Sequence, residues 1–346
     1  MKSIKLILSL AVVLTLTISC EDDDVAVPDV EVRDRGEQQI ADNDSLLGYL
    51  STHYYNSDFF LTGTNHKYTD IVVTELVEGE VVPAGHTLLI NAVETHTTTF
   101  EETDYQYYVL KLNQGAGDSP RFTDFVRMRY EGFTLEDGEV FDSRATPEDL
   151  PMQGVGFSGG VIRGWQLTIP MFNTAESFAI GSDGITNYNN FGLGMMFLPS
   201  GLAYFSNTAS GSVAAYSNLV FKFELLQYEE IDHDGDGIPS YIEDLDANLD
   251  VLDDDTDEDL APNYVDVDDD NDGVNTRDEL MPTSYTVDTN MNEEEPVLGP
   301  GEYEISRSTS NGILTINTVK VVDSDSNGTP DYLQEDIAEN YNEEEG

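Results

Sequence analysis

Residues 130–165 read YEGFTLEDGEVFDSRATPEDLPMQGVGFSGGVIRGW, and this stretch decides the fold. It contains the chain's single tryptophan, Trp165, directly after a Val-Ile-Arg-Gly run. The Asp137-Gly138 pair predicts a hairpin turn, because both central residues of such a turn need a positive φ. Apolar and aromatic residues on either side of the turn are expected to face a shared interior. The stretch therefore predicts a hairpin whose side chains build one continuous pocket with Trp165.

Strand patterns continue on both sides of this stretch. Residues 125–133 (FVRMRYEGF) alternate apolar and basic side chains, as expected of a strand in a sheet with one wet face. We therefore expect residues 105–228 to form one α+β domain, with an antiparallel twisted sheet wrapped on one short helix between Gly164 and Phe172. Pro170 is expected to end that helix irregularly. Further strands are predicted at residues 71–82 (with a turn at Glu78-Gly79), 88–93, 107–112, 140–144, 176–180, 196–205 and 218–228.

This segment resembles the core of the FKBP-type (immunophilin) peptidyl-prolyl isomerases over about residues 105–228. The matching motifs are Tyr-x-Gly at 130–132, Phe-Asp-Ser at 141–143, Val-Ile-Arg-Gly-Trp at 161–165, Ala-Tyr at 203–204 and Leu-Val-Phe at 219–221. The resemblance implies an FKBP-like fold and a prolyl-binding pocket. It also implies that the backbone N–H of Ile162 binds the substrate carbonyl and that Trp165 forms the floor. The catalytic pocket residues that it implies are Tyr130, Phe141, Asp142, Val161, Ile162, Trp165, Tyr204 and Phe221.

The chemistry of such an enzyme places few demands on the sequence. Rotation about an X-Pro bond meets a barrier of roughly 18–20 kcal/mol, because the amide loses resonance in the twisted state. An apolar slot that favours the twisted amide lowers this barrier without a nucleophile or a cofactor. Departures from the family bear on activity: Met152 replaces a pocket aromatic, Phe205 replaces a glycine, residues 181–195 are an insertion, and an Ile-Pro-Pro segment is absent. The alternative function is a non-catalytic, calcium-binding surface lipoprotein that uses the domain for protein recognition or adhesion.

Charge divides the chain into two regions. Its 346 residues include 68 acidic and 15 basic ones, which gives a formal net charge of −53. This charge excludes nucleic acid as a partner, because phosphate contacts need Lys or Arg. After Glu229 only Arg277, Arg307 and Lys320 are basic, and large apolar residues are few. We therefore expect no hydrophobic core there, and a region that is either organised by metal cations or disordered.

Residues 229–346 repeat one acidic template. Carboxylates alternate, as in Asp232-x-Asp234-x-Asp236-Gly237, and the twelfth position is often acidic. Calcium takes about six to eight oxygen ligands, which such a tight turn supplies. The spacing resembles thrombospondin type 3 repeats more than paired EF-hands and implies structural Ca²⁺; a solvated acidic tail is the alternative. The predicted metal ligands are Asp232, Asp234, Asp236, Glu243, Asp255, Asp257, Asp259, Asp266, Asp268, Asp270, Asp272, Glu279, Asp323, Asp325, Asn327 and Asp331.

The start of the chain predicts export. A basic start and an apolar run over residues 1–19 precede Cys20, which resembles the cleavage site of a bacterial lipoprotein. The acidic run at residues 21–24 resembles the surface-export tags of Bacteroidetes lipoproteins, and a solvated spacer is the alternative. We expect lipidation of Cys20 and a tether over residues 20–44. The chain would then be anchored to the outer membrane of the cell envelope, with proline-containing polypeptide clients as partners. An ordinary signal peptide with an incidental cysteine is the alternative. A helix is predicted at 45–55, and residues 45–104 are an accessory region, either packed on the isomerase domain or a dimerisation arm.

Overall fold

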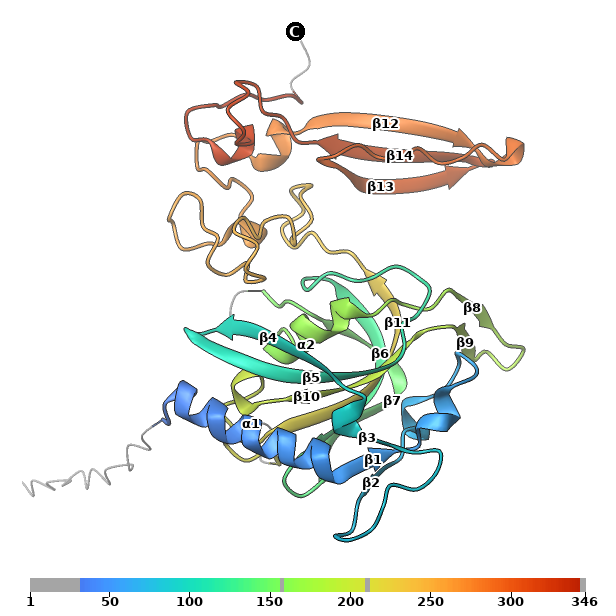
Figure 1. Cartoon of the computed structure of the whole chain (residues 1–346). Helices are drawn as coiled ribbons and strands as arrows, with labels where there is room; N and C mark the ends of the chain where they lie inside the picture. The colour runs from blue at the N-terminus through green and yellow to red at the C-terminus, as the bar shows by residue number, and fades with distance from the viewer. Residues whose placement is uncertain (1–31, 156–158, 209–211, 343–346) are drawn as a thin grey trace, which may run out of the picture. The chain divides into compact units, whose positions relative to one another are not determined.

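A six-stranded antiparallel sheet is the largest element of the computed structural model (Figure 1). The structure describes residues 32–155, 159–208 and 212–342; the predicted signal and Cys20 lie outside these ranges. The predicted α+β class with an antiparallel sheet is confirmed. In spatial order, the strands are β4 (Glu94–Phe100), β5 (Thr103–Asn113), β10 (Gly192–Leu198), β11 (Leu219–Glu229), β6 (Phe125–Thr134) and β7 (Val140–Pro151).

One face of the sheet packs against the short helix α2 (Arg163–Thr168). A 3-10 helix, Ile169–Met171, follows at once, and Pro170 within it cannot donate the backbone hydrogen bond that would continue α2. Trp165 and Leu167 of α2 join strand residues such as Phe223 in this core. The single short helix predicted between Gly164 and Phe172 is therefore confirmed.

The opposite face of the sheet is covered by N-terminal elements. These are α1 (Arg35–Thr52) and the small sheet β2-β1-β3, formed by β2 (Val73–Glu75), β1 (His53–Tyr55) and β3 (Thr87–Leu88). Because both faces are covered, the central strand β10 is buried at every position, and the predicted wet face is wrong for the centre of the sheet. Residues 45–93 therefore pack on the sheet, whereas residues 94–104 belong to it as β4 and the start of β5, so the sheet begins before the predicted boundary at residue 105. The buried side chains of this second core are Leu46, Leu50, Tyr55, Tyr68, Ile71, Leu89, Tyr108, Leu110, Phe133, Leu193, Met195, Phe197 and Val220.

Helix α1 begins ten residues before the predicted helix at 45–55, so the predicted tether over 20–44 is wrong at its C-terminal end. Asp34 caps the helix, because its side chain accepts a hydrogen bond from the Glu37 N–H at 2.9 Å. Asp42, expected in a solvated tether, is 2% exposed. Its carboxylate accepts hydrogen bonds from the Ser200 N–H at 2.9 Å and the Ser200 hydroxyl at 2.6 Å. These bonds allow a polar helix to pack on the sheet.

Two strand predictions in the accessory region are wrong. Residues 88–93 contain only the end of β3 and a 3-10 helix, Leu89–Asn91. Residues 71–82 contain only β2, and Gly79 adopts the positive φ of a turn without a returning strand. Strands β2 and β3 both pair with the short strand β1, so β1 limits their length. The apolar runs in the sequence did not indicate this limit.

Two hairpins also differ from prediction. Residues 135–139 join β6 to β7, and only Gly138 of the Asp137-Gly138 pair has a positive φ, at 70°. The loop is longer than a two-residue turn, and the Gly138 N–H donates to the Thr134 carbonyl at 3.0 Å. The strand predicted at 176–180 is β8 (Ser177–Ile180), which pairs with β9 (Thr186–Asn189) in a separate two-stranded sheet.

The acidic region contains a second sheet that its composition did not indicate. Strands β12 (Met281–Asp288), β14 (Ile313–Lys320) and β13 (Glu302–Ser310) pair in that order, all antiparallel. The expectation of no hydrophobic core after Glu229 is therefore wrong. Its small core contains the buried side chains of Ile238, Leu280, Val319 and Tyr332.

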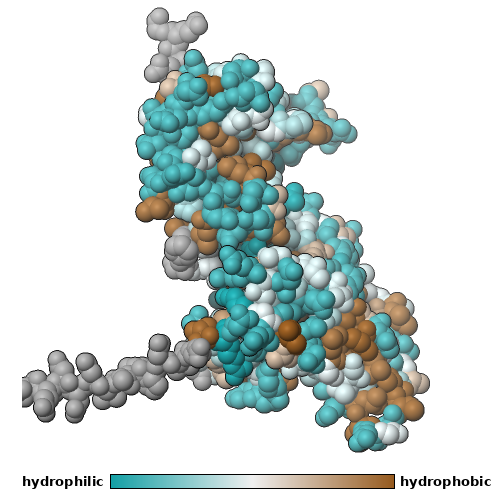
Figure 2. All heavy atoms as spheres, turned by 60° about the vertical axis from the view of Figure 1, so that its left-hand side comes forward, coloured by the Kyte–Doolittle hydropathy of each residue, from teal (hydrophilic) through white to brown (hydrophobic). Residues whose placement is uncertain are grey.

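Hydrophilic residues cover much of the face drawn in Figure 2, and hydrophobic residues gather in patches between them. Large apolar side chains exposed in the accessory region include Phe59, Leu61, Val77 and Val81. Among the described residues, no helix has both the length and the apolar composition needed to cross a bilayer.

The buried ion pair between Arg129 and Glu224 tests whether the sheet is covered on both faces. The Arg129 guanidinium lies 2.8 Å from the Glu224 carboxylate, whose side chain is 1% exposed and also accepts the Tyr68 N–H. Arg129→Ala leaves this charge buried without its partner, so we expect the free energy of unfolding to fall by about 3 kcal/mol. The control is Arg127→Ala on the same strand as Arg129. It removes a half-exposed ion pair with Asp149 and should lower the free energy of unfolding by less than about 1 kcal/mol. Urea denaturation measures both, and equal losses would contradict the burial of Glu224.

Candidate active site and candidate metal centres

Four aromatic rings from three strands and α2 meet edge to face. The ring centroids of Tyr130 and Trp165 are 5.0 Å apart, and those of Trp165 and Phe221 are 5.1 Å apart. Phe141 lies 5.6 Å from Phe221. Their interplanar angles of 83–85° are those that aromatic quadrupoles favour. Tyr130, Trp165 and Phe221 are buried and Phe141 is half-buried, so the cluster is a firm apolar surface with one accessible edge.

A polar group borders this aromatic cluster. The Tyr130 hydroxyl donates to Asp142 Oδ2 at 2.6 Å, and Arg144 Nη1 donates to Asp142 Oδ1 at 2.5 Å. Burial, followed by the hydrogen bond to Asp142, raises the pKa of Tyr130, so its phenol stays protonated and remains a donor. Burial and the charge of Asp142 also raise the pKa of Tyr204. Both carboxylate oxygens of Asp142 are therefore held in place.

The glycines of the sequence motifs are explained by close approach to this cluster. A Cβ added at Gly132 would lie 2.5 Å from the Phe221 ring and 3.0 Å from the Phe141 ring. A Cβ at Gly164 would overlap the side chain of Leu198. The Tyr-x-Gly motif thus lets β6 approach the rings, and the Arg-Gly-Trp motif lets α2 approach Leu198 of β10.

The structure brings all eight predicted pocket residues together. Val161, Ile162 and Tyr204 are partly buried and pack on the core that contains Tyr130, Trp165 and Phe221. Sequence reasoning missed Arg144, although its position two residues after Asp142 on β7 puts both side chains on one face of the strand.

The predicted departures have defined structural roles. Met152 is fully buried in the core next to α2. Phe205 has a φ of 47°, a left-handed conformation that favours the glycine expected there, and its ring packs 5.1 Å from Tyr216. Residues 181–195, the predicted insertion, contain the turn of the β8–β9 hairpin, β9 itself and the first residues of the central strand β10 (Gly192–Leu198).

Residues of the acidic repeats contact the segment that carries the aromatic cluster. Arg163, at the start of α2, donates to the carbonyl oxygens of Asn248 (3.1 Å) and Leu249. The Tyr264 hydroxyl donates to the Gly154 carbonyl at 2.9 Å. Sequence reasoning did not connect these regions, because no local pattern encodes a contact between residues so far apart in the chain.

Five acidic loops share one backbone conformation. Four were predicted, beginning at Asp232, Asp255, Asp268 and Asp323; the fifth begins at Asp244 and was missed. In every loop the fourth and sixth residues have positive φ, and the first aspartate accepts the N–H of the sixth residue. The positive-φ pairs are Gly235 and Gly237, Ala247 and Leu249, Glu258 and Leu260, Asn271 and Gly273, and Ser326 and Gly328. Glycine at the sixth position is thus not required for the loop, and the Asp244-x-Asp246-x-Asn248 spacing was the signal for the missed one.

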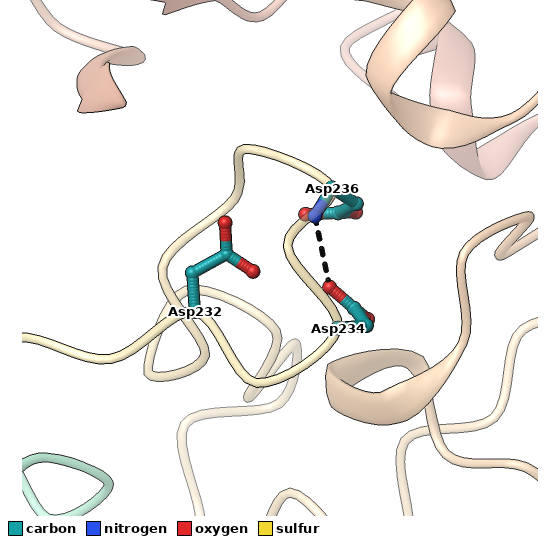
Figure 3. Close-up of side chains that lie close together, drawn as sticks. All are labelled: Asp232, Asp234 and Asp236. Carbon is teal, nitrogen blue, oxygen red and sulfur yellow. Dashed lines mark hydrogen bonds between the residues drawn. The ribbon is translucent and has the colours of Figure 1, made fainter. Parts of the chain in front are cut away.

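Some of the predicted calcium ligands converge in the structure, and others do not. Acids at the first, third and fifth positions converge in the loops that begin at Asp232, Asp255 and Asp268, and their oxygens lie within 4.8 Å of one another. Figure 3 shows Asp232, Asp234 and Asp236 around one turn. Glu279 is buried beside its loop's acids, whereas Asp266 does not join its loop's group. The missed loop contributes the group Asp244, Asp246 and Asp254.

The predicted ligand Asp331 accepts hydrogen bonds through both carboxylate oxygens. Its Oδ1 accepts the N–H of Ser324, and its Oδ2 accepts the Tyr341 hydroxyl, so both oxygens are already engaged. Side chains at the same ninth position, Ser240, Asn263 and Thr276, accept the N–H of the second residue in their own loops. Position nine therefore closes the turn, and Asp323, Asp325 and Asn327 are left without a fourth carboxylate from this position.

Several loop carboxylates are buried with one or both oxygens lacking a hydrogen-bond donor. Among the described residues, Glu243 and Glu279 have no hydrogen-bond partner for either carboxylate oxygen. Burial, followed by repulsion from neighbouring acids, raises the pKa of Glu243 to about 11 and that of Glu279 to about 9. The same causes raise the pKa of Asp234 to about 8. Oxygen-only donor sets that are dehydrated and mutually repulsive fit a hard divalent cation such as Ca²⁺.

Comparison with known proteins identifies the sheet domain. Residues 117–226 match the family model for the FKBP-type peptidyl-prolyl cis-trans isomerase, and residues 233–300 match the model described as BamM C-terminal. The FKBP-type isomerase FkpA of Aeromonas hydrophila is 36% identical over 138 residues, which are 39% of this chain and 42% of that protein. The FKBP-type 22 kDa isomerase of Escherichia coli K12 is 33% identical over 129 residues, 36% of this chain and 50% of that protein. Residues 117–226 are thus similar to the FKBP-type peptidyl-prolyl isomerases.

The matches cover only part of this chain and part of each relative. The chain spans half or less of the length of the two curated isomerases. A crystal structure of a peptidyl-prolyl isomerase from Pseudomonas syringae pv. tomato has 16% sequence identity and a TM-score of 0.33, over 57% of this chain and 98% of that chain. That similarity is too low to add to the family match.

Proposed function

We propose that the FKBP-type domain catalyses cis-trans isomerisation of X-Pro bonds in polypeptide clients. The observation that carries this proposal is the cluster of Tyr130, Trp165 and Phe221 bordered by the Tyr130–Asp142 hydrogen bond. The family match over residues 117–226 supports it.

The arrangement suits a reaction that needs shape and polarity rather than bond making. The proline ring would lie on Trp165, between the walls formed by Phe141 and Phe221. An apolar enclosure disfavours the planar, more polar amide relative to the twisted one, which lowers the barrier. Asp142, fixed by Tyr130 and Arg144, supplies a polar edge that does not move during the rotation. The backbone N–H of Ile162 would hold the substrate carbonyl.

Isomerase activity is testable with a protease-coupled prolyl-peptide assay on the full chain. We expect a rate above background, and we expect Tyr130→Phe to lower kcat/KM about tenfold because it frees Asp142. The matched control is Tyr108→Phe, which removes a hydrogen bond to Asn43 of 2.7 Å on the opposite face of the sheet. It should leave the rate unchanged. No rate above background with any residue before proline would reject catalysis.

The second candidate is a module that binds prolyl peptides without turning them over. Phe205 in a glycine conformation and Met152 in the core favour it, because they alter the surroundings of Tyr204 and α2. Trp165 is the chain's single tryptophan, so its fluorescence reports pocket occupancy directly. A saturable change in fluorescence without catalysis would select this candidate.

We also propose that the acidic repeats bind Ca²⁺ and are stiffened by it. The support is the set of convergent carboxylates in four consecutive loops together with their unpartnered buried oxygens. Extracellular calcium modules of this kind bind with dissociation constants of about 10⁻⁴–10⁻³ M. A lipid anchor on Cys20 and a site of action in the cell envelope, where the domain would assist folding of exported proteins, rest on the sequence pattern alone.

Calcium removal should loosen the repeats and leave the sheet domain folded. Limited proteolysis of the full chain with and without a calcium chelator measures this. We expect new cleavage after residue 229 upon chelation, because uncompensated buried carboxylates repel one another. Magnesium added back at the same concentration is the control for ionic strength. Unchanged cleavage and unchanged circular dichroism would contradict the proposal.

A further inference from the structure

Three carboxylates from two different loops converge in the repeat region. Asp236 and Glu243 belong to the loop at residues 232–243, whereas Asp269 belongs to the loop at residues 268–279. An oxygen of each lies within 4.8 Å of an oxygen of the other two. The exposed fractions of Asp236, Glu243 and Asp269 are 2%, 1% and 1%. The group therefore combines ligands that no single repeat contains.

These carboxylates lack the partners that buried charges normally have. Among the described residues, no donor reaches either oxygen of Glu243, either oxygen of Asp269 or Oδ2 of Asp236. Asp331 is equally buried, but its oxygens accept hydrogen bonds from Ser324 and Tyr341. Buried charges are ordinarily paired, hydrogen-bonded or bound to a metal. The converging oxygens therefore define a site for a positive ligand.

The protein's own cations do not supply that charge. Arg277 lies at the edge of the group, where it donates to the Gly235 carbonyl at 3.0 Å; burial raises the pKa of Asp236, and the charge of Arg277 offsets only part of that rise. The charges that act most strongly on Glu243 and Asp269 are those of other acids. One arginine does not balance three carboxylates, and a set of hard oxygen ligands selects Ca²⁺ over softer metals.

We propose that Asp269 is a calcium ligand that completes the site of the neighbouring loop, so that one Ca²⁺ ion binds between Asp236, Glu243 and Asp269. This inference rests on the proposed calcium function and adds a cross-link to it. The ion joins the loop at 232–243 to the loop at 268–279. It lies near Tyr332 of the small core, to which the first loop contributes Ile238 and to which Leu280, directly after the second loop, also belongs.

Only one of the five loops has an acidic residue at its second position, where Asp269 lies. The residues at that position are His233, Leu245, Thr256, Asp269 and Ser324, so only one of the five loops has an acid there. The Asp269 N–H closes its own turn by donating to the Thr276 hydroxyl at 3.2 Å. Its carboxylate is not needed for that turn and is directed to the other loop's acids.

Calcium titration calorimetry of the full chain, with Ca²⁺ alone as the probe, tests the assignment. Asp269→Asn should weaken one binding site at least tenfold or remove it. Glu243→Gln should affect the same site, and the double variant should lose no more than either single one. The control Asp278→Asn changes the same charge in the same loop, outside every convergent group, and should titrate like the parent.

Thermal unfolding separates a ligand from a merely structural residue. In a chelator, Asp269→Asn should unfold at the same or a higher temperature than the parent, because it removes buried repulsion. Addition of saturating Ca²⁺ should raise the unfolding temperature of Asp269→Asn by less than it raises that of the parent. Destabilisation in both conditions, or a titration identical to that of the parent, would overturn the inference. Absence of calcium binding by the parent would instead reject the proposed calcium function.

Discussion

Burial of the central sheet on both faces is the constraint on which the rest of the domain depends. Strand β10 has no exposed residue, so each side of it requires a cover. On one side α2 brings Trp165 against the strands, and on the other side α1 and β1–β3 complete a second core. The position of Trp165, and with it the proposed pocket, is thus fixed by packing on a sheet that the N-terminal segment holds from behind.

The sequence predicted the aromatic cluster well but the N-terminal cover poorly. Tyr130 and Trp165 lie in motifs in which close contacts impose glycine at fixed spacing, and such motifs can be recognised locally. Helix α1 has polar residues at buried positions, and Asp42 is satisfied by Gln38 on the same helix and by Ser200, which lies far away in the chain. Composition therefore indicated a tether, because the partner that makes the polar residue acceptable was invisible.

The acidic region shows the same limit. Alternating aspartates predicted the loops, since each loop is closed by its own side chains. Leu249 and Leu260 adopt the glycine conformation because the first aspartate holds the turn, so an absent glycine was a poor guide. The role of Asp269 could not be predicted from spacing within one repeat, because the residues that it approaches belong to another repeat.

The two regions are stabilised by different physics. The sheet domain buries apolar surface and satisfies the polar groups next to its aromatic cluster. The repeats bury carboxylates that the described protein atoms leave unpaired. The first region should thus be indifferent to divalent cations, whereas the second should require them.

Amide hydrogen exchange of the full chain, with and without Ca²⁺, measures the stability of the two regions separately. We expect protection of residues 232–279 to rise by orders of magnitude with Ca²⁺, while protection of β10 and β11 stays the same. Equal protection of the repeats in both conditions, or loss of protection in β10 on calcium removal, would contradict this expectation.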